Sequence, residues 1–288
     1  MTQHSRELSY ISVLAVFAHP DDEGFGCGGT LAMLAARGDH ITLVCATNGD
    51  AGEISDLALA TRETLAEVRR DELRQAMEIT GVSDTRFLGY RDSGMAGTED
   101  NNHPDSLSQA DPDRVIDQLV AILREVRPQL VITFDPTGGY GHPDHTAVNN
   151  HTSRAFSLAG DSGFSGPLAQ EEQPWSPTLL YYVCFPRSNF QRMWQKMLDA
   201  GITPPFASLE VDSIGTPDEA TTTILDVSAF VDTKIASLAC HRTQIDPNGP
   251  FSKLPEEMMR EMMSTEYFSL VFPEGASGEA DLLSKLAQ

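Results

Sequence analysis

Residues 10–46 read YISVLAVFAHPDDEGFGCGGTLAMLAARGDHITLVCA and decide the fold of this chain. Two continuous apolar runs, Tyr10–Ala18 and Ile41–Ala46, predict strands that are buried on both faces. Between them, Gly28–Arg37 has the composition of a helix and ends at Gly38, a residue type that often terminates helices. A strand, a helix and a second apolar strand are typical of a parallel sheet covered by helices.

The same alternation continues along the chain. Apolar positions spaced as on one helical face begin at Leu65, and Asp111 and Pro112 are suited to the cap and first turn of another helix. A further apolar strand is predicted at Leu130–Phe134, and a weaker one at Arg86–Leu88. We therefore expect the α/β class, with a Rossmann-like, doubly wound, mostly parallel sheet and helices on both of its faces.

The length of 288 residues allows one large domain or two small ones. We expect a single domain over residues 1–288, with its core at about 10–158 and a loop or insertion at 159–177. Residues 178–273 are expected to supply a smaller C-terminal part, made of strands and helices, that completes the pocket. Residues 274–288 are expected to form a tail.

The charge and cysteine content narrow the class of partner and the location. With 42 acidic and 20 basic side chains the formal net charge is −22, which argues against nucleic acid or an anionic membrane as the main partner. The four cysteines include no C-x-x-C pair, a pattern typical of a reduced, intracellular protein. The first apolar stretch is too short to span a membrane and resembles a signal peptide poorly, so we expect a cytoplasmic location. A monomer and a homo-oligomer are both compatible with the sequence.

Polar residues follow each of the three clearest strands. His19–Glu23 (HPDDE) follows the first strand, and Thr47–Glu53 (TNGDAGE) follows the second. Asp135 and then Gly138–His145 (GGYGHPDH) follow the third. Because ligands bind at the shared carboxyl edge of parallel strands, we expect these clusters to converge there.

The residue types in these clusters are those of a metal site. His19 and Asp22 are three residues apart, and so are His142 and His145. Imidazole nitrogen and carboxylate oxygen are ligands of Zn²⁺ and Fe²⁺, and residues beyond a set of three are available as a general base and an oxyanion stabiliser. The alternative is that these residues are helix caps and polar loop groups, with Asp21 or Asp22 capping the next helix. Two such clusters, each directly after a buried strand, favour the metal site.

A glycine-rich stretch raises a different possibility. Gly24–Gly29 (GFGCGG) fits the G-x-G-x-x-G pattern of dinucleotide binding, with Asp50 about 20 residues further on. In that motif the first glycine directly follows the strand, whereas here His19–Glu23 intervene. Their carboxylates would repel a pyrophosphate. A nicotinamide-dependent oxidoreductase is thus the less favoured interpretation, and we expect the glycines to let a helix pack closely on the sheet.

Two motifs together carry a family resemblance. A-H-P-D-D-E at Ala18–Glu23 and G-H-P-D-H at Gly141–His145 resemble the PIG-L/LmbE-like deacetylases, and Arg69–Leu73 (RRDEL) and Cys240–Gln244 (CHRTQ) also agree. The resemblance implies a metal-dependent, usually zinc, hydrolase that removes acetyl from small molecules bearing N-acetylglucosamine. The run Arg91–Met95 (RDSGM) resembles the subgroup of mycothiol-pathway N-acetylglucosaminyl-inositol deacetylases and the related conjugate amidase.

The resemblance also implies a metal set and a base. His19, Asp22 and His145 resemble the metal ligands, which implies one Zn²⁺ per chain, although Fe²⁺ suits the same donors. Asp21 resembles the general base that takes a proton from the attacking water.

The remaining roles concern the substrate and its oxyanion. His142 resembles the residue that stabilises the oxyanion or protonates the leaving amine, and Tyr140 one that polarises the carbonyl. Arg69 and Asp92 resemble residues that grip the sugar or its aglycone. We interpret Asp144 as the carboxylate partner of a metal-binding histidine, and we expect it to raise the pKa of His142.

The expected activity is removal of acetyl from an N-acetylglucosamine-type conjugate, a small-molecule substrate. Two alternatives stay open beside the oxidoreductase: an amidase that cleaves a larger acyl group or a thiol conjugate at the same site, and a non-catalytic metal-binding module. His241, which follows a predicted helix at Phe230–Cys240, is interpreted as a helix-end histidine rather than as part of the pocket wall.

Overall fold

The structure, a computed structural model, describes residues 10–205, 214–275, 283 and 285. Within these residues one sheet has the strand order β3-β2-β1-β4-β5-β7-β6. Its strands are β1 (Ser12–Phe17), β2 (His40–Thr47), β3 (Asp84–Tyr90), β4 (Leu130–Phe134), β5 (Leu179–Cys184), β6 (Thr223–Asp226) and β7 (Thr265–Phe272). The helices are α1 (Asp22–Arg37), α2 (Leu65–Thr80), α3 (Pro112–Val126), α4 (Gly138–Gly141), α5 (Pro143–Ala159), α6 (Arg187–Asp199), α7 (Val231–Leu238) and α8 (Glu256–Met263).

The sheet is mostly parallel, as the alternating pattern predicts. β1 pairs in parallel with both β2 and β4, and the parallel pairing continues to β3 on one side and β5 on the other. β7 is antiparallel to its two neighbours, β5 and β6. β1 lies at the centre, and Val13–Phe17 are at most 1% exposed, as expected for a strand with helices on both faces. The α/β fold class is confirmed.

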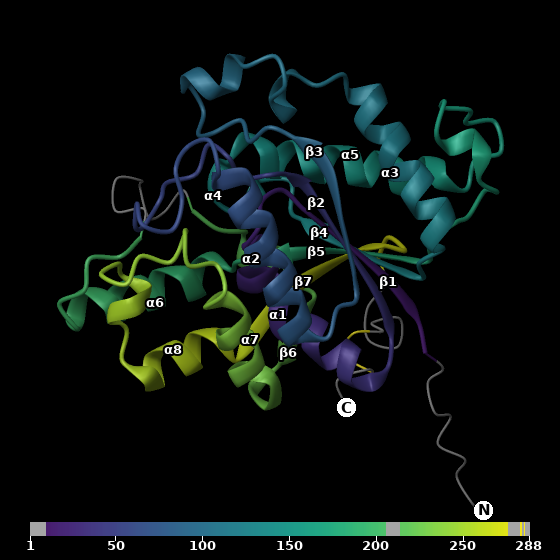
Figure 1. Cartoon of the computed structure of the whole chain (residues 1–288). Coiled ribbons are helices and arrows are strands. Elements are labelled where there is room, and N and C mark those ends of the chain that lie inside the picture. The colour runs from purple at the N-terminus through teal and green to yellow at the C-terminus, as the bar shows by residue number, and fades with distance from the viewer. Residues whose placement is uncertain (1–9, 206–213, 276–282, 284, 286–288) are drawn as a thin grey trace, which may run out of the picture.

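Helices cover the sheet in two groups (Figure 1). α1, α2 and α7 contact one another on one face, and α3 and α5 pack together on the other. α6 and α8 lie beside the sheet where β5 ends and β7 begins, and Lys196 of α6 pairs there with Glu261 of α8. None of the helices in the described ranges is long and apolar enough to cross a membrane.

Helix α1 begins earlier than the sequence predicts. We expected a helix from Gly28, but α1 starts at Asp22 and contains a kink at Cys27, where φ is −149° and ψ is 20°. The added turn contains two glycines, which are poor helix formers, so tertiary packing rather than propensity holds it.

The glycines of this stretch allow close packing. A Cβ atom added at Gly24 would lie 2.6 Å from Leu238, and one added at Gly29 would lie 2.6 Å from Val227. One added at Gly26 would lie 3.2 Å from Val183 of β5, which agrees with the expected close packing on the sheet, whereas Gly24 faces α7 and Gly29 faces the residue after β6. The carboxylates of Asp22 and Glu23 occupy the first turn of α1, where a dinucleotide phosphate would bind, so the structure does not favour the oxidoreductase interpretation.

The order in which the chain adds strands to the sheet changes direction at β1. The chain proceeds from β1 to β2 and β3 on one side, and then crosses back to place β4 on the other side of β1. The connections after β1 and β4 therefore leave in opposite directions, which opens a crevice at the carboxyl ends of these strands. His19 follows β1, and His142 and His145 follow β4.

Candidate active site

Three side chains meet in the crevice between β1 and β4. His19 follows β1, Asp22 is the first residue of α1, and His145 lies in the first turn of α5. His19 Nδ1 lies 3.2 Å from His145 Nε2 and 3.3 Å from Asp22 Oδ2, and His145 Nε2 lies 3.2 Å from Asp22 Oδ1. Two ligands of a tetrahedral zinc are about 3.3 Å apart, given metal–ligand bonds of about 2.0 Å. The three donor groups therefore fit one metal ion.

The other ring nitrogens of both histidines face acceptors. His19 Nε2 lies 3.2 Å from Asp144 Oδ2 and 3.4 Å from Asp92 Oδ1. His145 Nδ1 lies 3.0 Å from the carbonyl oxygen of Gly138. A hydrogen on each of these nitrogens satisfies the acceptor and leaves His19 Nδ1 and His145 Nε2 with free lone pairs. Both lone pairs are thus available at the position that Asp22 also reaches.

His142 offers an alternative ligand. One ring nitrogen from each of His19, His142 and His145 lies within 4.8 Å of the others. The separations that involve Asp22 are shorter, 3.2 and 3.3 Å, so the predicted set with Asp22 is the tighter one.

His142 has a structural role as well. It is the N-cap residue of α5, and its Nδ1 accepts a hydrogen bond from the backbone N–H of Asp144 at 3.2 Å. The helix-cap interpretation therefore holds for this residue. Burial, together with positive charge on His19 and His145, lowers the pKa of His142 to about 4. Asp144 acts to raise this pKa, as expected, but burial and the two histidines outweigh it, so the net shift is downward.

The surroundings of the predicted ligands favour positive charge. Burial alone would lower the pKa of His19, but Asp92, Asp144 and Asp22 outweigh it and hold that pKa well above its usual value. Burial would raise the pKa of Asp22, yet His145 and His19 hold it well below its usual value. Carboxylates that favour a proton on an imidazole also favour a divalent cation beside it.

Asp21 is adjacent to Asp22 in sequence but has different surroundings. Its carboxylate lies 3.3 Å from the guanidinium of Arg69, and it makes no side-chain cap bond to α1. Burial raises the pKa of Asp21 to about 6, with Arg69 opposing this rise and Asp22 adding to it. A carboxylate with a raised pKa beside a metal-binding cluster is suited to accept a proton.

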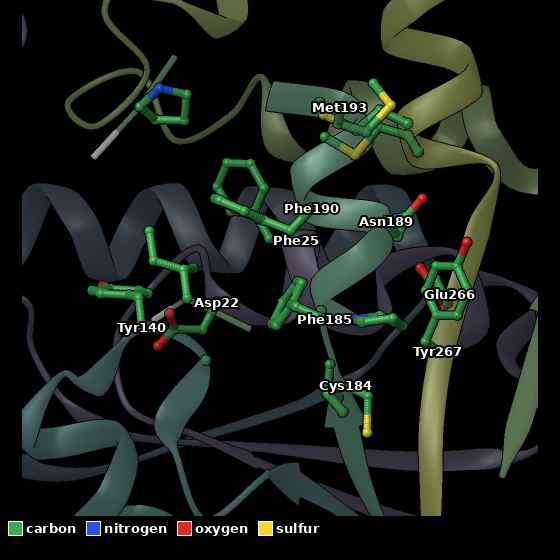
Figure 2. A pocket seen from close by; sticks show the side chains of 18 of the residues that line it. Asp22, Phe25, Tyr140, Cys184, Phe185, Asn189, Phe190, Met193, Glu266 and Tyr267 are labelled. Atoms are coloured by element: carbon green, nitrogen blue, oxygen red, sulfur yellow. The ribbon is translucent and has the colours of Figure 1, made fainter. Parts of the chain in front are cut away.

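A cavity of about 310 Å³ opens beside these residues. Asp21, Asp22, Tyr140 and His145 line one end of it, and Figure 2 shows Asp22 and Tyr140 together there. Burial raises the pKa of Tyr140, which keeps its hydroxyl protonated and able to donate. The rest of the wall is mostly aromatic and sulfur-containing; it includes Phe25, Phe185, Phe190, Met193, Trp194 and Met197.

The two residues expected to grip the substrate are buried. Arg69 is 3% exposed and donates to the carbonyl oxygens of Gly49 at 2.8 Å and Pro20 at 2.7 Å. Asp92 is 4% exposed and accepts from the backbone N–H of Gly94 at 2.8 Å. Both side chains are bonded to the protein here, and their contact with substrate stays a prediction.

The other polar residues at the strand ends hold the loops around the site. Asp50 accepts from the backbone N–H of Asp92 at 3.1 Å. Asp135 accepts from the backbone N–H of Gly139 at 3.2 Å and from the hydroxyl of Thr216 at 2.6 Å. The three clusters therefore meet at one edge of the sheet, and the first and third supply the candidate ligands.

Sequence reasoning missed a buried pair next to Asp21. His241 is 0% exposed, and its Nε2 lies 3.1 Å from Glu23 Oε1. The prediction placed His241 at a helix end, which is where it lies, just after α7, but did not give it a partner. The partner is 218 residues away in sequence, and no spacing rule relates residues at that separation. The only signals were that Glu23 and His241 both belong to segments with the family resemblance.

The chain is similar to known deacetylases. Residues 14–156 match the family model described as PIG-L, GlcNAc-PI de-N-acetylase. The 1D-myo-inositol 2-acetamido-2-deoxy-alpha-D-glucopyranoside deacetylase of Acidothermus cellulolyticus is 43% identical, with 95% of this chain and 94% of that protein covered. The protein of the same name from Geodermatophilus obscurus is 40% identical, with 93% and 94% covered.

A solved structure shows the same fold. N,N'-diacetylchitobiose deacetylase from Pyrococcus horikoshii superimposes with a TM-score of 0.64 over 90% of this chain and 83% of that one, at 21% identity. The paired motifs, the family model and the full-length relatives agree. The chain belongs to the PIG-L family.

Proposed function

We propose that this chain is a metal-dependent N-deacetylase that removes acetate from an N-acetylglucosamine-type conjugate. The convergence of His19 Nδ1, His145 Nε2 and the Asp22 carboxylate at separations of 3.2 and 3.3 Å carries this proposal. Hydrolysis of an amide at neutral pH needs an activated water, and this donor set with an open position is the kind that supplies one.

The metal we propose is one Zn²⁺ held by His19, Asp22 and His145, although the same donors suit Fe²⁺. When bound, the ion would lower the pKa of a water molecule and polarise the substrate carbonyl. Asp144 and Asp92 would hold the ring of His19 in the orientation that leaves Nδ1 free.

The protein's own groups would move the proton and bind the developing charge. Asp21, whose carboxylate Arg69 orients, would accept the proton of the attacking water. His142, whose Nδ1 is occupied by the backbone of α5, has Nε2 left to donate to the carbonyl oxygen. The protonated hydroxyl of Tyr140 would donate to the same oxygen from the cavity end that it shares with Asp22.

The substrate we propose is a pseudo-disaccharide in which the amino sugar is linked to inositol. The names of the two full-length relatives support this class. The cavity of about 310 Å³ is large enough for a sugar ring, and its aromatic wall offers a surface for the ring's apolar face.

A second candidate function rests on the character of that wall. An acetyl group has one methyl, whereas Phe185, Phe190, Trp194 and their neighbours line a much longer apolar surface. An amidase that accepts a larger apolar acyl group on the same amine would use this surface.

The test is a comparison of substrates with one preparation of the zinc-loaded protein. Amine release would be measured from the inositol-linked N-acetylglucosaminide, from N-acetylglucosamine itself and from the N-hexanoyl analogue of the inositol conjugate. We expect the highest kcat/KM for the acetylated inositol conjugate. A higher value for the hexanoyl analogue would favour the amidase, and no amine from any substrate would contradict both functions.

A further inference from the structure

The backbone of Asp21 is held in an unusual conformation. Its φ is 125° and its ψ is −24°, a region that residues with a side chain rarely adopt. Such a conformation persists only where the surrounding structure holds it. Asp21 is also the residue that directly precedes α1, so its φ sets the direction in which its carboxylate leaves the turn.

One buried carboxylate bonds to this backbone. Glu23 Oε2 accepts a hydrogen bond from the backbone N–H of Asp21 at 3.1 Å. Its second oxygen, Oε1, lies 3.1 Å from His241 Nε2. Glu23 is 1% exposed and His241 is 0% exposed, so neither group can exchange its partner for water.

We propose that Glu23 and His241 are positioning residues that hold Asp21 in the conformation needed to accept the proton of the attacking water. The inference rests on the proposed role of Asp21 as the base. It assigns a role in the reaction to the C-terminal part of the chain.

His241 also supplies the hydrogen-bonding partner that the buried carboxylate of Glu23 needs. An ionised carboxylate is buried at acceptable cost only when a charged or hydrogen-bonding partner satisfies it. Burial opposes charge on His241, but Glu23 and Asp21 outweigh burial and the nearby Arg69 and raise the pKa of His241. The imidazole therefore serves as the partner of Glu23, and Glu23 keeps its second oxygen for Asp21.

The segment that carries His241 is fixed from a separate direction. The backbone N–H and hydroxyl of Thr243 donate to the carboxylate of Glu72 on α2, at 3.0 and 2.6 Å. Glu72 is 1% exposed. It therefore anchors the same short segment to the N-terminal half of the chain without touching Asp21.

Asp21 is thus held at two points. Glu23 bonds to its backbone N–H, and Arg69 bonds to its carboxylate at 3.3 Å and to the carbonyl oxygen of Pro20 at 2.7 Å. If Glu23 is removed, the carboxylate keeps its contact with Arg69 but the turn is free to relax. A displacement of about 1 Å at a catalytic group can lower a rate about a hundredfold.

A double-mutant cycle tests whether Glu23 acts through Asp21. Steady-state kcat and KM, bound zinc and the unfolding midpoint would be measured for the wild type, Glu23→Ala, His241→Ala, Asp21→Ala and the double variant Glu23→Ala/Asp21→Ala. We expect Glu23→Ala and His241→Ala to lower kcat about tenfold to a hundredfold, with KM and zinc content within about twofold of the wild type. In the Asp21→Ala background, Glu23→Ala should cause no further loss of kcat.

Two further variants separate positioning from general support of the fold. Glu23→Gln retains an oxygen that accepts from Asp21 and should recover most of the kcat that Glu23→Ala loses. It also keeps the test open if Glu23→Ala does not fold. Asp117→Asn is the matched control, because Asp117 on α3 is another buried carboxylate that accepts from two backbone N–H groups, those of Leu168 and Ala169, and has no contact with the site. It should lower the unfolding midpoint while kcat stays within about twofold.

The outcomes distinguish this inference from the function on which it rests. Additive losses in the double variant, or an equal loss of kcat in Asp117→Asn, would overturn the positioning role while the deacetylase proposal stands. A wild-type kcat in Asp21→Ala would overturn the assignment of the base, and the positioning role with it. Absence of amine release by the wild type would overturn the proposed function itself.

Discussion

Two neighbouring aspartates show how backbone conformation separates chemical roles. Asp22 is directed at His19 and His145, which hold its pKa well below the usual value. Asp21 is directed at Arg69, and burial raises its pKa to about 6. Two carboxylates in one turn therefore differ in proton affinity because φ of Asp21 is positive and their side chains leave in different directions.

The difference predicts the behaviour of Asp21→Asn. The amide cannot accept a proton from water, so kcat should fall about 10²–10⁴-fold, the usual contribution of a general base. Asp21 contributes none of the three proposed metal donors, so bound zinc should stay near one per chain. Metal analysis and steady-state kinetics on the same sample check both parts. Loss of zinc together with activity would contradict the division of roles.

The buried pair formed by His241 and Glu23 predicts a pH dependence of stability. The pKa of His241 is raised in the folded protein by Glu23 and Asp21, against burial and Arg69. A group whose pKa is raised on folding contributes its full stabilisation at pH values below its pKa in the unfolded protein, which is about 6.5 for histidine. That stabilisation is lost as the pH rises through the pKa that the group has in the folded protein.

His241→Gln should therefore lose more unfolding free energy, relative to the wild type, at pH 6 than at pH 9. Urea unfolding of both proteins at the two pH values measures this difference. An equal loss at both pH values would show that the charge on His241 does not stabilise the fold.

At the scale of elements, a buried ion pair holds the kink of α1. Past the kink at Cys27, the backbone N–H groups of Gly29 and Thr30 donate to the carboxylate of Glu266, both at 2.8 Å. Before the kink, the ammonium group of Lys234 donates to the carbonyl oxygen of Phe25 at 3.3 Å. The anion therefore lies at the N-terminus of the second helical segment and the cation near the C-terminus of the first, as the helix dipoles favour.

Lys234 and Glu266 also pair directly at 2.6 Å, and each is at most 3% exposed. Lys234→Met leaves the carboxylate buried without its counter-ion, so the unfolding free energy should fall by about 3–5 kcal/mol. The double variant Lys234→Met/Glu266→Gln removes both charges and should be more stable than the single one. Urea unfolding at constant pH measures both values. A single variant that loses less than about 1 kcal/mol would contradict a stabilising pair.

The elements that local patterns predict are those whose partners lie nearby in sequence. β1, β2, β4 and the helix capped by Asp111 are confirmed, since continuous apolar runs and a cap at a fixed offset are visible in a few residues. β7 was not predicted, because Glu266 interrupts its apolar alternation. Glu266 is buried with partners far away in sequence, namely Lys234 and the backbone N–H groups of Gly29 and Thr30. The early start of α1 was not predicted either, because its first turn is held by packing against residues distant in sequence, such as Leu238 beside Gly24.

The candidate site, like the elements, is predictable only where local sequence determines it. The meeting of the His19–Glu23 and Gly138–His145 segments is predictable, because parallel strands bring their carboxyl ends to one edge. The roles of side chains within that edge are not. Which oxygen faces His19, or which residue contacts Glu23, depends on rotamers and on segments far apart in sequence.

At the scale of the molecule, the C-terminal part completes both the sheet and the site. β7 pairs with β5, α7 packs on α1 and α2, and His241 and Thr243 bond to carboxylates of the N-terminal half. Contacts so distributed predict that the chain unfolds as one unit, in line with the expected single domain. Most of the predicted tail, 274–288, lies outside the described residues.

The two tryptophans allow a test of whether the chain unfolds as one unit. Trp175 and Trp194 both lie after the segment that matches the family model. The fluorescence of Trp194 reports on the second half of the chain, and that of Trp175 also on its contact with the first half, where its indole N–H donates to the carbonyl oxygen of Pro128 at 2.7 Å. Far-UV circular dichroism reports on the helices of both halves. The two probes should give the same midpoint in urea, as a single cooperative transition requires. Separate midpoints would show that the halves are independent domains.

The most direct measurement is the zinc content and amine release of His145→Ala beside His151→Ala. Both histidines lie on α5, but only His145 contributes to the set with His19 and Asp22. The wild type and His151→Ala should each bind about one zinc and release amine from the inositol-linked N-acetylglucosaminide. His145→Ala should lose the metal and at least about a thousandfold in activity. Zinc and activity retained in His145→Ala, or absent from the wild type after zinc is added, would contradict the proposed metal centre.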